Sequence, residues 1–518
     1  MEKSEYGKTE KNQFFRKITK YTIFLSIIFI CTLITKLILF PSQLPVNFDA
    51  ISYFMYSSDI FLTSQLPNEW SPVNNGWPIV VGGFFMLFNS DNVMELMQIQ
   101  KLLSTVISAI IIFPVYFLCK IFVSRKIAIV GAILIALEPR LMINSFLGLT
   151  DPLYLLLMTT SLALFLQKNR QLIYLSFVVV GLATLVRGEG ITLFLVLSII
   201  FFIRFRQERL RVIPRYMIVL GLFLLVILPM SAYGIDVNGV DGIFMRSVSS
   251  GGDIISNINE PGSQNEPSLR IQIFIKNLFW IMIPNFIIFI PIGIFLIFRQ
   301  ITVEKLTIIL SLIILAIPSF YAYLNGILET RYFFILLPIF VVLSTMSVDS
   351  IFKKLRNNNV VIITIIIAVL SVSVIFYDYQ KPNEGFQRES FEITKEVYSI
   401  IDMRNTRGMD GYFRIYGMME QWPMKYTEMS TGGKGIGRTS TYDSLEDYID
   451  NSRMRGLTHI ITDEKRDRIP FLSEIFYEKV QKPYLKQVYD SKENGFNYHV
   501  KVFEIDYKAY DIIQDNRD

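Results

Sequence analysis

Repeated apolar runs constrain the fold of this chain more than any other feature. Each run is about 17–22 residues long, the length that a helix needs to cross a bilayer core of roughly 30 Å. Within hydrocarbon every backbone amide must be satisfied inside its own segment, so the runs are predicted to be helices. Of the 518 residues 52% are hydrophobic and only 18% are charged, which is unusual for a soluble globular protein.

The hydropathy of these runs predicts about eleven membrane-spanning helices. The predicted spans are 21–40, 101–119, 127–143, 151–167, 171–186, 190–204, 216–233, 278–298, 305–323, 331–348 and 360–377. The runs 171–186 and 190–204 are short, so they form either two spans or one tilted, partly buried hairpin.

The basic residues predict how these spans are oriented. With segment 1–20 in the cytoplasm, the turns predicted to lie inside carry clusters of Lys and Arg, as in 119–126 and 204–215. The predicted outer loop 41–100 contains no Lys or Arg. This asymmetry follows the positive-inside rule and predicts a multi-pass protein of the cell membrane. An odd number of spans then places the C-terminus outside the cytoplasm.

Two long loops are predicted on the outer side. Loop 41–100 contains an apolar stretch, Trp77–Phe88, that is too short to span and fits a re-entrant or interfacial helix. The second loop, 234–277, is rich in Gly, Ser and Asn. Loops of this length are usually functional or disordered.

From about residue 383 the composition changes, because charged residues and tyrosines replace the apolar runs. Thr458–Asp463 and Tyr498–Ile505 are predicted strands, the second after a turn at 493–495. Glu389–Arg404 and Pro470–Val480 are predicted helices. The predicted architecture is therefore a cytoplasmic segment 1–20, a polytopic α-helical membrane domain 21–382 and a small extracytoplasmic α/β domain 383–518.

Nine charged residues lie at the predicted outer ends of the spans, and no comparable set of acids occurs within the spans. Charges at membrane depth are costly and by default mark function. Their gathering at one face favours an active site at the membrane surface over a transport pathway. These residues are Asp49, Glu69, Glu138, Arg140, Asp151, Arg187, Glu189, Glu329 and Arg331.

Each of these residues also has a purely structural interpretation. Asp49 is either a general base or cation ligand, or a solvated cap. Asp151 precedes Pro152 and fits a helix start as well as a second site acid. Arg187 and Arg331 either bind a phosphate or anchor helix ends. Glu138 and Arg140 either pair with each other or act directly on a substrate.

The order of four short motifs resembles that of type C (GT-C) glycosyltransferases, in the branch of protein O-mannosyltransferases and aminoarabinose transferases. These enzymes take a sugar from a polyprenyl-phosphate carrier at the outer or lumenal membrane face. The resemblance covers 21–378. The motifs are Asn47-Phe48-Asp49, the segment from Glu138-Pro139-Arg140 to Leu149-Thr150-Asp151-Pro152-Leu153, the hairpin Gly181–Gly190, and Glu329-Thr330-Arg331-Tyr332-Phe333.

The resemblance implies roles for these residues. Asp49 would be the catalytic acid/base, with Asp151 orienting the acceptor or a divalent metal ion, Mg or Mn, that both carboxylates would hold. Arg187 and Arg331 would face the carrier phosphate. Further substrate-binding candidates are Glu69, Glu138, Arg140, Glu189 and Tyr332.

The sequence departs from the resemblance in three places. It lacks the Trp-Trp-Asp motif of oligosaccharyltransferase catalytic subunits and the His-Pro-Asp-Glu-like start of some mannosyltransferases. Asp49 is followed by Ala50, where the first loop of the family often has two adjacent acids, which bears on metal dependence.

The predicted function is an inverting glycosyltransferase that uses a polyprenyl- or dolichyl-phosphate-linked hexose or pentose, such as dolichyl-phosphate mannose. The acceptor is a glycan, a lipid or a protein, as in protein glycosylation, and no nucleic acid is involved. A lipid-linked glycan transporter is one alternative, although it would carry polar groups near the bilayer midplane and internal repeats. A non-catalytic membrane scaffold is the other.

Overall fold

The computed structural model describes residues 2–46, 49–68, 71–72, 74–242, 267–356, 358–400, 427–430, 436–438, 444–453, 457–464, 470–479 and 481–515. The chain forms two compact units. The first consists of Met1–Phe40, Tyr56–Asp91 and Ile99–Lys381. The second consists of Pro41–Met55, Asn92–Gln98 and Pro382–Asp518.

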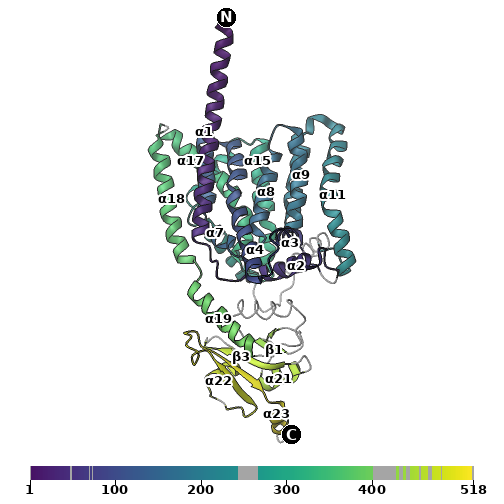
Figure 1. Ribbon diagram of the computed structural model, residues 1–518. Coiled ribbons are helices and arrows are strands. Elements are labelled where there is room, and N and C mark those ends of the chain that lie inside the picture. Colours follow the sequence, from purple (N-terminus) through teal and green to yellow (C-terminus); the bar gives the residue numbers. More distant parts are fainter. Residues whose placement is uncertain are drawn as a thin grey trace. The chain divides into compact units, whose positions relative to one another are not determined.

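The described residues of the first unit form helices joined by turns and irregular segments, and none of them belongs to a strand. Figure 1 shows its long helices running side by side, with α8, α9 and α11 as neighbours. The helices are α1 (Glu2–Ile38), α2 (Asp49–Thr63, shared with the second unit), α3 (Gly76–Phe88), α4 (Val93–Ile110, also shared), α5 (Ile112–Phe122), α6 (Arg125–Ala136), α7 (Pro139–Ser145), α8 (Asp151–Phe165), α9 (Arg170–Val186), α10 (Gly190–Arg204), η1 (Arg206–Arg211), α11 (Val212–Asn238), α13 (Pro267–Met282), α14 (Phe289–Phe298), α15 (Val303–Ile314), α16 (Ala316–Leu324), η2 (Thr330–Leu336), α17 (Leu337–Lys354) and α18 (Asn359–Gln380).

Six helices among the described residues are long and apolar enough to cross a membrane, or seven if the bent pair α6 and α7 is one span. The six are Lys20–Ile38, Val93–Phe122, Arg206–Asn238, Val303–Leu324, Thr330–Lys354 and Asn359–Val397. Five further apolar helices are shorter, namely α3, α8, α9, α10 and α14. The chain is a multi-pass membrane protein, and the predicted number of eleven spans stays a prediction.

Two predicted spans were wrong as continuous helices, and proline accounts for both breaks. Span 127–143 is bent by 54° between α6 and α7. Pro139 occupies the first turn of α7, where it needs no hydrogen-bond acceptor for its nitrogen. Span 278–298 is interrupted between Met282 and Phe289, where Pro284 cannot donate to a helix and restricts the residue before it.

The predicted outer loop 41–100 is largely helical, and its position outside the membrane stays a prediction. It contains α2, α3 and the beginning of α4. Only the short helix α3 was expected, at Trp77–Phe88. Helix α2 places Ala50, Ile51 and Phe54 on a buried face at helical spacing, and polar residues such as Ser52 and Ser58 lower its mean hydropathy below that of a span.

The second unit contains an antiparallel five-stranded sheet in the order β2-β1-β3-β5-β4. Its strands are β1 (Thr427–Ser430), β2 (Ile436–Arg438), β3 (Leu457–Asp463), β4 (Leu485–Asp490) and β5 (Val500–Ile505). Its helices are α19 (Glu384–Ile400), α21 (Leu445–Arg453), α22 (Pro470–Phe476) and α23 (Tyr507–Asp515). The predicted strands at 458–463 and 498–505 are confirmed, whereas β4 and α23 were not predicted.

Alternation along the central strands divides this core into two layers. Ile461 and Val502 are paired across β3 and β5 and pack against Ile393 of α19. The adjacent pair, Ile460 and Phe503, belongs to a second cluster with α21, α22 and α23. Successive side chains of a strand point to opposite faces, so the sheet has a helical layer on each face.

Candidate active site

A pocket in the first unit is lined by four separate parts of the sequence, three of which supply charged or aromatic side chains. Its empty space is about 290 Å³, part of it open to solvent. The lining residues come from α8, from the turn between α9 and α10, from α16 and from η2. They are Asp151, Tyr154, Leu155, Arg187, Glu189, Pro318, Arg331, Tyr332, Phe334 and Ile335.

Asp151 is the first residue of α8 and is buried, with 2% of its surface exposed. A carboxylate is favourable at the positive end of a helix dipole. Thr150 is the N-cap and makes no side-chain capping bond. The Asp151 carboxylate instead accepts hydrogen bonds across the fold, from Arg187 to one oxygen and from Asn144 Nδ2, 3.2 Å away, to the other.

The turn between α9 and α10 is tightly closed, which fixes the position of Arg187. Helix α9 ends at Val186 and α10 begins at Gly190. A Cβ atom at Gly190 would lie 2.6 Å from the Thr184 hydroxyl oxygen and 2.7 Å from the Thr184 Cα atom. No larger residue fits there without moving the backbone of α9.

The segment before α3 holds the same turn from the side. The Gly188 backbone N–H donates to Asn74 Oδ1 at 3.1 Å. A Cβ atom at Gly76 would lie 2.8 Å from the backbone carbon of Leu185. The chain before α3 and the end of α9 therefore approach each other at backbone distance.

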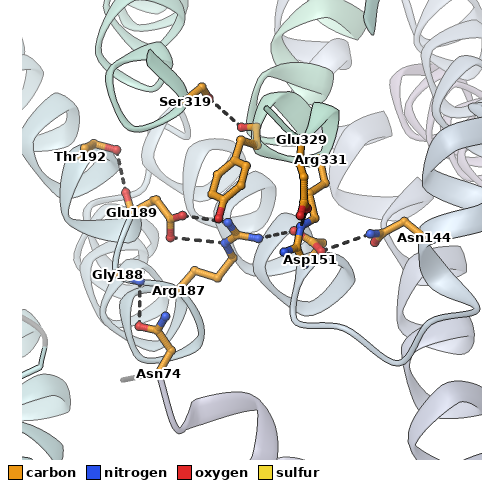
Figure 2. Close-up of polar contacts among 11 residues, drawn as sticks. Asn74, Asn144, Asp151, Arg187, Gly188, Glu189, Thr192, Ser319, Glu329 and Arg331 are labelled. Atoms are coloured by element: carbon orange, nitrogen blue, oxygen red, sulfur yellow. Dashed lines mark hydrogen bonds and ion pairs between the residues drawn. The ribbon is translucent and has the colours of Figure 1, made fainter. Parts of the chain in front are cut away.

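The Arg187 guanidinium lies between two carboxylates (Figure 2). Its Nη1 donates to Asp151 Oδ1, its Nη2 donates to Glu189 Oε1 at 2.8 Å, and its Nε donates to Glu189 Oε2 at 3.3 Å. Its central carbon is 5.8 Å from the ring centre of Tyr154 and 5.5 Å from that of Tyr332. Aromatic rings at this distance attract the cation as well.

A second arginine enters the pocket from η2. Arg331 forms an ion pair with Glu329, whose side chain is 54% exposed. The Tyr332 carbonyl accepts a hydrogen bond of 2.7 Å from the Ser319 hydroxyl, which joins η2 to α16. The structure therefore brings five predicted site residues to one pocket: Asp151, Arg187, Glu189, Arg331 and Tyr332.

Glu138 and Arg140 lie elsewhere in the first unit, at the bend between α6 and α7. Both are buried, and Arg140 Nη1 is 3.3 Å from Glu138 Oε1. Arg140 also donates to the carbonyls of Trp280 and Ile283 at the end of α13. Glu138 Oε2 accepts from Asn285 at 3.3 Å. Neither residue lines the pocket, and a direct role on substrate stays a prediction.

Asp49 and Glu69 complete the set of predicted site residues. Asp49 begins α2 in the second unit, and its carbonyl accepts a 2.8 Å hydrogen bond from the Ser52 hydroxyl. Its role as a base stays a prediction. Glu69 falls outside the described residues.

Sequence reasoning missed three polar residues of the site. Asn144 holds Asp151, and Asn74 holds Gly188. Tyr154 lines the pocket with 3% of its surface exposed, and its hydroxyl has no hydrogen-bond partner among the described residues. Tyr154 follows Asp151 by one helical turn, a spacing that could have indicated its place in the pocket.

The donor set around Asp151 does not fit a divalent metal ion. Cations of this kind need carboxylate oxygens with free lone pairs directed at them. Each Asp151 oxygen accepts one N–H group, and the positive charge of Arg187 beside the carboxylate repels a second cation. Among the described residues, no three His, Cys, Asp or Glu side chains gather where they could hold a metal.

Solved structures resemble the chain over most of its length. One is ArnT from Cupriavidus metallidurans bound to undecaprenyl phosphate, with 10% identity, 94% of this chain and 97% of that chain covered, and a TM-score of 0.58. Another is the oligosaccharyltransferase AglB from Archaeoglobus fulgidus in complex with an inhibitory peptide and a dolichol-phosphate, with 12% identity, coverage of 85% and 69%, and a TM-score of 0.56. Both enzymes are GT-C enzymes.

This chain has the GT-C fold. Residues 78–233 also match the family model for dolichyl-phosphate-mannose-protein mannosyltransferases. The matched segment includes Asp151 and Arg187 but ends before Arg331. The chain spans 59% of the length of the Archaeoglobus oligosaccharyltransferase in its apo form, with 11% identity, 76% of this chain covered and a TM-score of 0.52. No curated protein matches the chain in sequence.

Proposed function

We propose that this chain is an integral-membrane glycosyltransferase that moves a sugar from a polyprenyl- or dolichyl-phosphate carrier to an acceptor. The observation that carries the proposal is the convergence of two carboxylates, two arginines and two tyrosines on one pocket of a GT-C fold. Buried charge at membrane depth is costly and is kept chiefly where it has a function.

The proposed reaction is a single displacement with inversion at the anomeric carbon. Asp49 removes the proton from the acceptor hydroxyl, and the acceptor oxygen attacks the face opposite the phosphate. The carrier phosphate leaves with the electron pair of the broken glycosidic bond. Arg331 faces that phosphate and offsets its growing charge.

Arg187 serves this reaction through its two carboxylates. Three of its five N–H donors are directed at Asp151 and Glu189, so most of its hydrogen-bonding capacity is committed to the two acids. We therefore assign Arg187 to holding Asp151 and Glu189 toward the acceptor and the sugar, with its charge acting on the phosphate at longer range.

Tyr154 supplies a hydroxyl for the sugar. A buried hydroxyl without a partner costs free energy, and a bound polar ligand would remove that cost. Its ring sits beside Arg187, so the hydroxyl is held in one place. Tyr332 from η2 lines the same pocket.

The neighbours support the class of donor. The ArnT structure contains undecaprenyl phosphate, and the AglB structure contains a dolichol-phosphate. The matching family model is named for dolichyl-phosphate mannose, so a mannosyl donor is the first hexosyl candidate. We place the reaction at the outer face of the cell membrane, with segment 1–20 in the cytoplasm and 383–518 outside.

The test is transfer of radiolabelled sugar from polyprenyl- and dolichyl-phosphate donors in membranes that contain wild type or Asp49→Asn at matched levels. Asp59→Asn is the matched control, because it removes the same charge from the same helix at a residue to which the proposed reaction gives no role. We expect transfer by wild type and the control, and none by Asp49→Asn.

Each other outcome has a definite meaning. Equal transfer by all three proteins would keep the enzyme and remove Asp49 as its base. No transfer by wild type, across several sugars and acceptor extracts, combined with movement of a labelled lipid-linked glycan across proteoliposomes, would replace the proposal by a transporter.

A further inference from the structure

One cation holds two carboxylates together in this pocket. Arg187 contacts Asp151 with one nitrogen and Glu189 with two others (Figure 2). The Arg187 and Asp151 side chains are 13% and 3% exposed, and that of Glu189 is 23% exposed. Two acids that share a largely buried site need a positive charge between them, because two neighbouring carboxylates resist ionising together.

A divalent metal ion, instead of a guanidinium, can also hold two neighbouring carboxylates together. Mg²⁺ and Mn²⁺ bind carboxylate oxygens directly and keep several water molecules. Here the guanidinium occupies the space between the two acids, and Asn144 takes the remaining oxygen of Asp151.

The aromatic walls favour a guanidinium over a hydrated ion. Arg187 lies near the rings of Tyr154 and Tyr332, and its planar fork matches two carboxylates at once. Arg187 is also part of the tight turn that Gly190 closes, which fixes the position of its backbone. A guanidinium stays charged at any physiological pH, so the cation is permanently present.

We propose that Arg187 takes the place of a divalent cation between Asp151 and Glu189, so that sugar transfer at this site needs no metal ion. Arg187 is thus a positioning residue for the two carboxylates. The role of Arg187 in sugar transfer rests on the proposed function. Whether Arg187 occupies the position of a divalent cation can be measured without any enzyme activity.

The deciding experiment measures Mn²⁺ binding to purified full-length protein by electron paramagnetic resonance. The proteins are wild type, Arg187→Ala, Arg187→Ala/Glu189→Gln and Arg331→Ala. The last is the matched control, because it removes an equal charge from the same pocket and leaves Arg187 in place. Far-ultraviolet circular dichroism and gel filtration verify folding, and the neutral variant Arg187→Gln replaces Arg187→Ala if that variant is misfolded.

We expect Arg187→Ala to gain one Mn²⁺ site that wild type and Arg331→Ala lack. The double variant should bind Mn²⁺ about tenfold or more weakly than Arg187→Ala, because one carboxylate ligand is gone. Arg187→Lys keeps a cation and should gain no site.

Transfer assays supply the second half of the test. Wild-type transfer should change by less than about twofold on adding EDTA or Mn²⁺. Stoichiometric Mn²⁺ binding by wild type, or transfer that EDTA abolishes and Mn²⁺ restores, would overturn the inference while leaving the glycosyltransferase in place. Absence of transfer under all conditions would count against the proposed function alone, since Mn²⁺ binding would still report on Arg187.

Discussion

Two acid–base pairs with the same two-residue spacing behave differently in this fold. Glu138 and Arg140 are buried at a helix bend, and Arg140 divides its donors between Glu138 and two backbone carbonyls. Arg187 and Glu189 line a pocket, and Arg187 reaches a third residue, Asp151. Identical local spacing thus produces a structural clamp in one place and a candidate active site in the other. The difference lies in what the rest of the chain packs around each pair.

The largest expected effect on stability comes from replacing Arg140 in the buried Glu138–Arg140 pair. Arg140→Met leaves Glu138 buried without its cation, and removing one partner of a buried ion pair costs about 3–5 kcal/mol of unfolding free energy. Thermal unfolding in detergent measures the loss. Arg140→Lys and the double variant Glu138→Gln/Arg140→Met should each recover part of it. A stable Arg140→Met protein with impaired transfer would instead make Arg140 a site residue.

The largest expected effect on activity lies in the pocket. Asp151→Asn keeps the shape of the side chain but removes its charge, and we expect transfer to fall by roughly 10²–10³-fold. Arg187 keeps its two hydrogen bonds to Glu189, so thermal stability should change little. Initial rates normalised to folded protein test this expectation. A large drop in melting temperature with normal transfer would assign Asp151 to structure.

The turn that carries Arg187 should respond to a single methyl group. Gly190→Ala places a Cβ atom against the backbone of Thr184, and such overpacking costs about 1–3 kcal/mol. The displaced turn should also lower transfer. Gly83→Ala is the matched control, since a Cβ atom there meets nothing within 4 Å. Equal melting temperatures and rates for the two variants would show that the turn is not constrained by Gly190.

The smallest expected effect concerns a third pair of the same spacing. Glu329 is more than half exposed beside Arg331, and exposed ion pairs contribute less than about 1 kcal/mol. Glu329→Gln should therefore leave the melting temperature nearly unchanged and alter the KM for the lipid donor more than kcat. A loss of stability as large as that of Arg140→Met would contradict this ordering.

The class of fold could be predicted from the sequence because a chain segment within a membrane can adopt few backbone structures. Long apolar runs must form helices, and the alternating residue types of Tyr498–Ile505 predicted β5. The bends at Glu138 and near Pro284 were not predicted, because hydropathy averages over a proline break. Helix α2 was missed because its polar serines lower its hydropathy, although it buries one face.

The site was predicted in part for a similar reason. Asp151, Arg187 and Arg331 stand out because charges near a membrane are rare. Asn144, Asn74 and Tyr154 are uncharged and common, so only their contacts reveal them. The sequence also could not show that Arg187 would turn toward two acids, since pairing between distant helices leaves no local pattern.

The closeness of Gly76 to Leu185 and of Gly190 to Thr184 has a consequence for variation among related chains. A turn enclosed by backbone on two sides has no room for an inserted residue or a longer side chain. In a library of random variants, the positions around Arg187 should tolerate almost no exchange, and deletions or insertions between α9 and α10 should be lost entirely. Mutational tolerance along the chain would then mark the pocket even before a substrate is known.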